Sequence, residues 1–257
     1  MAYDKIIDST VLDGNLTSVA DAIREKSGGT ESLEFPNGFV EAIAGISAGG
    51  GGDDTTLKGI IERTVTNATL PSGLTKIGFH AFYGCPYLEM VSLPNSVTEI
   101  AMNAFTSCTK LALTSLPSGI TSIGNDAFND CTNLALTSLP SGLTKINNNA
   151  FTNCKNLLLA SLPSGITSIG SYAFQNCTKL PLASLPSGIT SIGSYAFRNC
   201  TGLTTITFEG IPSSINSSAF AGCTNLTTIN VPWAEGEVAN APWGATNATI
   251  NYNYTGA

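Results

Sequence analysis

Apolar residues recur along this chain with a fixed period of 23 residues, from Leu70 to Asn230. The sixth copy of the pattern, Leu185–Thr207, reads LPSGITSIGSYAFRNCTGLTTIT, and seven such copies follow one another without insertion or deletion. A constant period in the twenties is typical of solenoids, in which every copy forms one coil and neighbouring coils share a continuous apolar core. The pattern therefore predicts a solenoid of seven coils over residues 70–230.

Within one copy, the spacing of the apolar residues predicts the elements of a coil. The segment Leu203–Phe208 has apolar residues spaced as in a strand whose intervening residues face outward. Pro186–Gly188 predicts a turn, and Ile189–Gly193 a second short extended piece. In Ala196–Cys200, the spacing A-F-x-x-C suits a single helical or 3₁₀ turn with its apolar side chains inward. We therefore expect two short strands and one helical or 3₁₀ turn per coil.

The copies at the two ends of the array differ from the others, as expected of coils that cover an open edge. Before the array, residues 55–69 include the segment Thr56–Thr66, which predicts a capping strand over the first edge. After the array, residues 231–257 hold four large aromatic residues: Trp233, Trp243, Tyr252 and Tyr254. We expect them to pack over the last edge, where an uncovered strand would pair with other chains. A part in ligand binding is the alternative for these aromatic residues.

A small helical module, residues 1–46, precedes the array. Leu16–Ser27 and Pro36–Ile46 predict two short helices, because each places apolar residues on one face. Residues 47–54 read SAGGGGDD, and four consecutive glycines predict a flexible linker. A module this short buries little core alone. We therefore expect it to anchor the chain or to form a homo-oligomer.

One cysteine occupies the same position in each of the seven copies: Cys85, Cys108, Cys131, Cys154, Cys177, Cys200 and Cys223. Disulfide frameworks and zinc sites need partners at particular spacings, and no CxxC or Cys/His pair occurs. Stacked residues of one phase have parallel side chains, which is poor geometry for a disulfide. We expect the cysteines to point inward and to form a structural ladder of small buried side chains.

Composition narrows the classes of partner. Charged residues make up 11% of the chain, against about 25% in an average soluble domain. The net charge is −7 and no basic run occurs, which argues against nucleic acid and against an anionic membrane surface. No run of 18 apolar residues is present, so we expect no membrane insertion. The first residues, MAYDKIIDSTVLDG, lack the basic and apolar segments of a secretory signal peptide.

The sequence offers little for catalysis. His80 is the single histidine, and the repeated Ser and Thr residues form no recognisable Ser/His/Asp set. The acids are scattered, whereas a glycan hydrolase would need two carboxylates facing each other across a groove. Asp53 and Asp54 fall far short of a calcium cage. We therefore expect no catalytic residue, no metal site and no cofactor.

The first candidate binding surface is a row of apolar residues five positions after the cysteines, made of Met90, Leu113, Leu136, Leu159 and Leu182. Two interpretations stay open. A bulge rotates the leucines inward, or the leucines face outward and form an apolar stripe that marks a partner surface.

The second candidate surface lies before the Ala-Phe pairs, where Tyr172 and Tyr195 occupy equivalent positions of adjacent copies. We expect these tyrosines to be near neighbours. Tyrosines beside amides and serines suit the recognition of sugars or protein loops. The alternative is that they are ordinary half-exposed residues of a polar surface.

The repeat C-x-x-L-x-x-I-x-[LF]-P-x-x-[IV]-x-x-I-x-x-x-A-F-x-x-C resembles the BspA-like leucine-rich repeats of bacterial surface and adhesion proteins, over Leu70–Asn230. The flanks Ser18–Ile43 and Val231–Asn253 resemble modules found beside such repeats in tail-associated, host-binding proteins of bacteriophages and prophages. The resemblance implies a leucine-rich repeat fold and binding without catalysis. It defines no catalytic residues.

These resemblances lead to a functional hypothesis. We expect a non-enzymatic phage tail protein, made in the host cytoplasm and carried in the virion. It would present the solenoid to a bacterial surface glycan or protein, or to another virion protein. The absence of a signal-peptide pattern favours this interpretation, because virion proteins leave the cell by lysis. The alternative is a bacterial cell-surface adhesin that binds host or matrix proteins.

Overall fold

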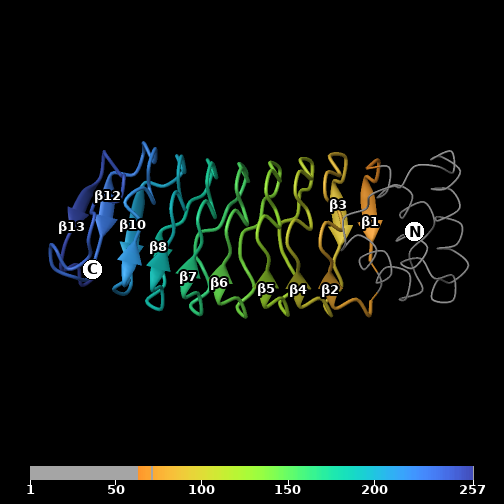
Figure 1. Cartoon of the computed structure of the whole chain (residues 1–257), viewed down its shortest axis with the longest axis horizontal. Coiled ribbons are helices and arrows are strands. Elements are labelled where there is room, and N and C mark those ends of the chain that lie inside the picture. Colours follow the sequence, from red (N-terminus) through yellow and green to blue (C-terminus); the bar gives the residue numbers. More distant parts are fainter. Residues whose placement is uncertain (1–62, 71, 257) are drawn as a thin grey trace, which may run out of the picture.

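The computed structural model describes residues 63–70 and 72–256, which wind into a solenoid whose coils lie side by side along one axis (Figure 1). We number the seven coils by their 23-residue copies, from coil one (70–92) to coil seven (208–230). The predicted helical module 1–46, the linker 47–54 and the first part of the capping segment 55–69 lie outside the described residues.

One long face of the solenoid, here the groove face, carries one two-residue strand in every coil. These strands are β2 (Lys76–Ile77), β4 (Glu99–Ile100), β5 (Ser122–Ile123), β6 (Lys145–Ile146), β7 (Ser168–Ile169), β9 (Ser191–Ile192) and β11 (Ser214–Ile215). They form two parallel sheets, β2–β4–β5 and β6–β7–β9–β11, in which paired strands have a register of 23 residues, as between Ile169 and Ile192. Within each strand the isoleucine is buried and the residue before it faces solvent.

The opposite face carries strands only towards the two ends of the solenoid. They are β1 (Asn67–Thr69), β3 (Met90–Ser92), β8 (Ser184–Leu185), β10 (Thr205–Phe208), β12 (Thr228–Asn230) and β13 (Thr249–Asn251). β1 pairs with β3, and β8, β10, β12 and β13 form a separate parallel sheet. In the part of the chain that the structure describes, coils two to four have no strand on this face.

The missing strands correct the prediction of two strands per coil, and they resolve the two interpretations of the leucine row. In coil six, the buried Ile206 and Phe208 alternate with outward residues, as a regular strand requires. In coil three, Leu136 and Leu139 are buried and two exposed residues separate them. Two outward residues in succession break the period of two, as in a bulge. The leucines thus point inward, and these coils form no regular strand on this face.

The segment around Ala-Phe forms a succession of tight turns of the 3₁₀ kind, which is one of the two forms that the spacing predicts. Backbone amides donate to carbonyls three residues earlier, as from Cys154 to Phe151 at 3.2 Å. Asn149 and Asn153 have positive φ angles of 54° and 61°, and a left-handed residue interrupts a right-handed helix. The hydrogen-bond spacing is therefore that of a 3₁₀ turn, without a continuous helix.

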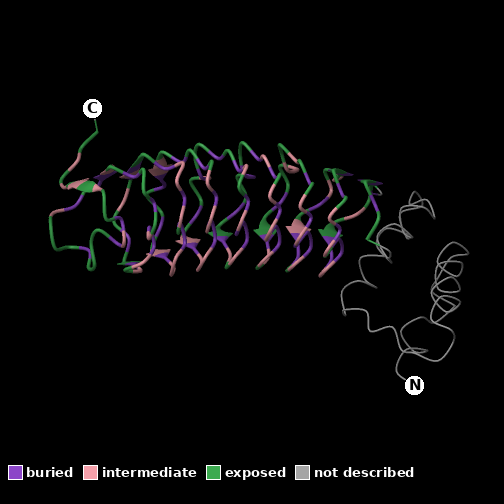
Figure 2. Cartoon of the chain, turned by 90° about the horizontal axis from the view of Figure 1, so that it is seen from above, coloured by how far each residue is buried: buried purple, intermediate pink, exposed green. Residues whose placement is uncertain are grey.

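Buried segments recur from coil to coil along the solenoid (Figure 2), and identical side chains stack inside it to form its core. The phenylalanines of the Ala-Phe pairs have ring centroids 5.1–5.6 Å apart and interplanar angles of 12° or less, from Phe82 to Phe220. The seven cysteines are buried and free. Six of them, from Cys108 to Cys223, donate a thiol hydrogen bond to a phenylalanine carbonyl of the preceding coil, at 2.9–3.1 Å. Each of these six thiols thus has a hydrogen-bond partner inside an apolar core.

Polar ladders connect the coils as well. The side-chain amide of Asn153 donates to Asp130 at 2.6 Å, and those of Asn176 and Asn199 each donate to the preceding asparagine, at 2.7 and 2.9 Å. Asn153, Asn176 and Asn199 all have positive φ, which asparagine tolerates better than most residues. One residue type therefore serves both the backbone conformation and the hydrogen bonds between coils.

Both ends of the stack are covered. At the beginning, β1 pairs in parallel with β3. At the other end, β13 pairs with β12, and Trp233 and Trp243 are almost fully buried against Phe208, with centroids 5.2 and 5.8 Å from its ring. The indole of Trp243 donates to the carbonyl of Ala239 at 2.8 Å. The two tryptophans are packing residues in this fold.

The cysteine ladder makes stability sensitive to alkaline pH. Burial raises the pKa of Cys85 from near 9 to about 11 and that of Cys223 to about 12, and it raises the pKa of the five cysteines between them well above the usual range. Folded thiols therefore stay protonated at pH values where unfolded thiols ionise. The stabilisation is complete below about pH 9 and is lost as pH rises towards the folded pKa values.

We expect cooperative unfolding between about pH 9 and pH 11, because each thiol removes about 1.4 kcal/mol of stability per pH unit in this window. Circular dichroism during an alkaline titration measures the midpoint. Cys154→Ala removes one titrating thiol and should make the pH dependence shallower by about one proton. A fold that is unchanged at pH 11 would contradict the prediction.

Candidate functional site

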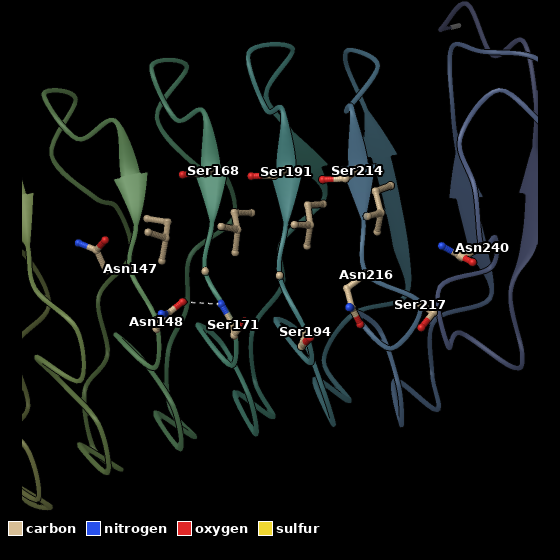
Figure 3. Close-up of a pocket in the computed structure, with 16 residues that line it drawn as sticks. Asn147, Asn148, Ser168, Ser171, Ser191, Ser194, Ser214, Asn216, Ser217 and Asn240 are labelled. Carbon is tan, nitrogen blue, oxygen red and sulfur yellow. Dashed lines mark hydrogen bonds between the residues drawn. The ribbon is translucent and has the colours of Figure 1, made fainter.

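A groove of about 660 Å³ runs across coils four to seven on the groove face, over β6, β7, β9 and β11 (Figure 3). Its lining consists of four rows of equivalent residues and one residue of the C-terminal segment. The lining residues are Ile146, Asn147, Asn148, Ser168, Ile169, Gly170, Ser171, Ser191, Ile192, Gly193, Ser194, Ser214, Ile215, Asn216, Ser217 and Asn240.

The strands position the first row, Ser168, Ser191 and Ser214. Each serine precedes a buried isoleucine in a two-residue strand, so the alternation of the strand turns its hydroxyl outward. The parallel register places the three serines opposite one another in adjacent strands. At the spacing of parallel strands, successive hydroxyls recur about every 5 Å along the groove.

Gly170 and Gly193 form the floor of the groove. A Cβ atom at Gly193 would lie 2.6 Å from the backbone nitrogen of Ser171, and one at Gly170 would lie 2.7 Å from that of Asn148. These separations are shorter than real Cβ contacts, so a side chain at either position would force the neighbouring coil to shift. The backbone approaches the neighbouring coil closely here, and no side chain fills the space above the floor.

Asparagines stand where the glycine floor ends. Asn147 and Asn216 occupy the position of the floor glycines in coils four and seven. Asn147 donates its side-chain amide to the carbonyl of Ile123 at 2.6 Å, where β5 and β6 are not paired. Asn148 accepts a hydrogen bond from the amide of Ser171 at 2.8 Å. The groove is thus bounded at both ends by amides, with Asn240 beyond the last coil (Figure 3).

No ionisable residue lines the groove. The rest of this part of the chain is also neutral overall, because residues 63–257 contain seven acidic and seven basic residues. The whole net charge of −7 therefore belongs to residues 1–62. Electrostatic attraction therefore contributes little to ligand choice at this surface. Hydroxyl and amide groups, which both donate and accept hydrogen bonds, set its chemistry.

The groove contains the elements of binding and none of the usual elements of catalysis. Its serines have no histidine or carboxylate beside them in the lining, so no hydroxyl is activated. His80 lies in coil one, stacked on Phe79 at 3.8 Å, and burial lowers its pKa. Among the described residues, no group of three or more His, Cys, Asp or Glu is placed to hold a metal ion. No helix within the described ranges is long and apolar enough to cross a membrane.

The leucine row does not form an exposed stripe. Leu136, Leu159 and Leu182 are fully buried, and Leu113 is partly buried against the core. Met90, at the same position of coil one, is 65% exposed because the regular strand β3 turns it outward. The proposed stripe of four aligned, exposed leucines is therefore wrong, since the bulge brings this position into the core.

The structure does bring Tyr172 and Tyr195 together. Their rings stack with centroids 5.4 Å apart and an interplanar angle of 27°. The guanidinium of Arg198 lies over the ring of Tyr195, 5.1 Å from its centroid. Both tyrosines are half-buried, and each directly follows a serine of the groove, Ser171 and Ser194 respectively.

Sequence reasoning missed the groove itself. The serines and glycines concerned belong to the common phrase SIGS, which serves as ordinary strand and turn sequence in a solenoid. The signal that could have revealed the site is the change along the array. The outward strand position is Lys, Glu, Ser and Lys in coils one to four and then serine in coils five to seven. The groove begins where the long charged side chains end.

The glycine floor should tolerate no side chain. Gly193→Ala places a methyl group against the backbone of coil five and should reduce the free energy of unfolding by about 1–3 kcal/mol. Gly188→Ala is the matched control, because the nearest atoms to its Cβ are 3.6 Å away and its change should stay within about 1 kcal/mol. Thermal unfolding compares the two. Equal melting temperatures would contradict the close approach of the coils.

Several solved structures are similar to this chain. A solved leucine-rich repeat protein from Bacteroides ovatus is similar at 23% identity, over 74% of this chain and 61% of its own, with a TM-score of 0.48. A leucine rich cell surface protein from Faecalibacterium prausnitzii is 24% identical, over 65% of this chain and 63% of its own, with a TM-score of 0.49. The Leucine Rich Repeat protein of T. pallidum is 32% identical, over 65% and 72% of the two chains, with a TM-score of 0.41.

This chain thus spans less than two thirds of the first two of these proteins. No curated protein matches it. The sequence profile described as "BspA type Leucine rich repeat region (6 copies)" matches residues 62–181 and 145–240, which is well over half of the chain. The chain belongs to the BspA-type leucine-rich repeat family.

Proposed function

We propose that this protein is a non-enzymatic binding protein that recognises a glycan or protein of the bacterial cell surface through the groove over β6, β7, β9 and β11. The observation that carries the proposal is the lining, which combines hydroxyls, amides and glycines with no charge and no catalytic group. Leucine-rich repeat proteins generally act through such binding surfaces.

The scaffold supports recognition because its backbone fixes the shape of the groove. Parallel pairing fixes the strands, and the glycine floor is determined by the approach of neighbouring coils. A volume of about 660 Å³ lies within the usual range of ligand sites, about 300–1,000 Å³. A ligand therefore meets polar groups that are already in place, and binding does not have to order a flexible loop.

We also propose that the protein is tail-associated in a phage or prophage and is carried in the virion. Support comes from the segments 18–43 and 231–253, which resemble modules of such proteins. In this arrangement residues 1–46 attach to another virion protein or form a homo-oligomer, and the solenoid faces the bacterium. The second candidate is an adhesin on a bacterial cell surface, favoured by the type of repeat. The neighbouring genes distinguish the two, since tail and lysis genes belong only to the first.

A filled groove should abolish recognition. In Ser191→Lys, a long side chain enters the middle of the first row, and the fold tolerates it because Lys76 and Lys145 occupy the same strand position in other coils. The control is Ser122→Lys, at the equivalent position of coil three outside the groove. We expect labelled full-length protein to bind bacterial cells, Ser191→Lys to bind at least tenfold more weakly, and Ser122→Lys to bind as the parent does.

Cell binding is measured by flow cytometry over a panel of bacterial strains, and circular dichroism verifies that both variants fold. The proposal fails if the parent binds no strain, or if Ser191→Lys binds as tightly as Ser122→Lys.

A further inference from the structure

Tyr172 and Tyr195 occupy a backbone position that disfavours tyrosine. Their φ angles are 59° and 54°, in the left-handed region. The same position in coils one to four also has positive φ, and it holds His80, Asn103, Asp126 and Asn149. Asparagine, aspartate and histidine are enriched at such angles, whereas a bulky residue is an outlier there. The fold alone therefore favours asparagine at this position, and strained residues of this kind gather at functional sites.

The tyrosine pair lies in the two coils that form the floor of the groove. Coils five and six combine an outward strand serine, a floor glycine and a left-handed tyrosine. No other coil has all three: coil three has Ser122 and Gly124 with Asp126, and coil seven has Ser214 with Asn216 and Ser218. The three features also repeat in the same order in both coils. Their coincidence points to one site that spans two coils.

The arrangement holds the two rings firmly. The ring stack and the hydrogen bond from the amide of Tyr172 to the carbonyl of Ser194 (2.8 Å) connect the two coils, and within coil six the guanidinium of Arg198 lies over Tyr195. The stacked pair offers amphipathic rings, and each tyrosine directly follows a serine of the groove lining in the chain. Sugars combine hydroxyl groups with apolar C–H faces, and tyrosine offers a partner for each.

We infer that coils five and six form a subsite for a short segment of an uncharged glycan. Ser168, Ser191, Ser171 and Ser194 bind its hydroxyls, and the Tyr172–Tyr195 pair contacts a sugar ring beside them. This inference rests on the proposed function and specifies its ligand. A protein ligand fits less well in the groove itself, because the groove offers hydroxyls and amides while its isoleucine side chains are buried. No ionisable group lines the groove, and the guanidinium of Arg198 at the tyrosine pair lies over the ring of Tyr195.

The test measures binding of neutral hexose and N-acetylhexosamine tetrasaccharides, with uronic-acid tetrasaccharides of the same length as the charged comparison. The full-length double variant Tyr172→Asn/Tyr195→Asn should bind at least tenfold more weakly than the parent. Its thermal midpoint should equal or exceed that of the parent, because asparagine suits the left-handed backbone. Tyr254→Asn, which removes a tyrosine far along the chain from this pair, should change neither property.

Three results would overturn the inference: unchanged glycan binding by the double variant, a large fall of its thermal midpoint, or a preference for the charged tetrasaccharides. Ser191→Lys separates this inference from the proposed function. If Ser191→Lys loses cell binding while the tyrosine variant keeps it, the groove stands and the tyrosine subsite fails. If the parent binds cells but no neutral glycan, the ligand is of another class and only the proposed function survives. If the parent binds no cells, both fail.

Discussion

The stacking of equivalent residues at the spacing of parallel strands is the constraint on which the rest of this structure depends. Each residue lies against its counterpart 23 positions away, as the register between Ile146, Ile169 and Ile192 shows. A side chain that packs well on a copy of itself is therefore stabilised repeatedly, and one that does not is penalised repeatedly. Stacked phenylalanines, hydrogen-bonded asparagines and thiols that donate to a neighbouring carbonyl all satisfy this condition.

The same constraint explains why the two long faces differ. On the groove face the strand is only two residues long, so a single inward isoleucine and a single outward residue complete it, and every coil has one. On the opposite face a regular strand needs strict alternation over a longer segment. Coils two to four lack this alternation because their leucine lies one position early. The leucine is buried in the core, and the hydrogen bonds of a regular strand do not form there. Burial of a leucine stabilises by about 1.5–3 kcal/mol, more than the typical net value of one hydrogen bond.

The candidate site uses positions that the constraint leaves free. Outward strand residues and the residues at the turn do not pack in the core. They therefore vary between coils, while the backbone and the core residues of the coils stay the same. A glycine in two adjacent coils lowers the surface there, and amides raise it again at both ends. The ligand site is thus a local change in a repeated surface, held by backbone that the rest of the solenoid makes rigid. Tyr172 and Tyr195, whose φ angles are positive, depart from the residue types that this backbone conformation favours.

The sequence by itself determined the period, the solenoid and the inward position of the cysteines. It also determined the proximity of Tyr172 to Tyr195, because a constant 23-residue repeat places equivalent residues in adjacent coils. It also limited the chemistry, since charge and histidine are scarce. Only the tertiary structure decided the fate of the leucines after the cysteines, because an early leucine is compatible with an exposed strand or a buried bulge until packing selects one. The tight turns around Ala-Phe likewise depend on backbone angles that spacing does not encode. The groove emerged only from the folded chain, because its depth comes from the distance between Gly193 and the neighbouring coil, which no single copy of the repeat reveals.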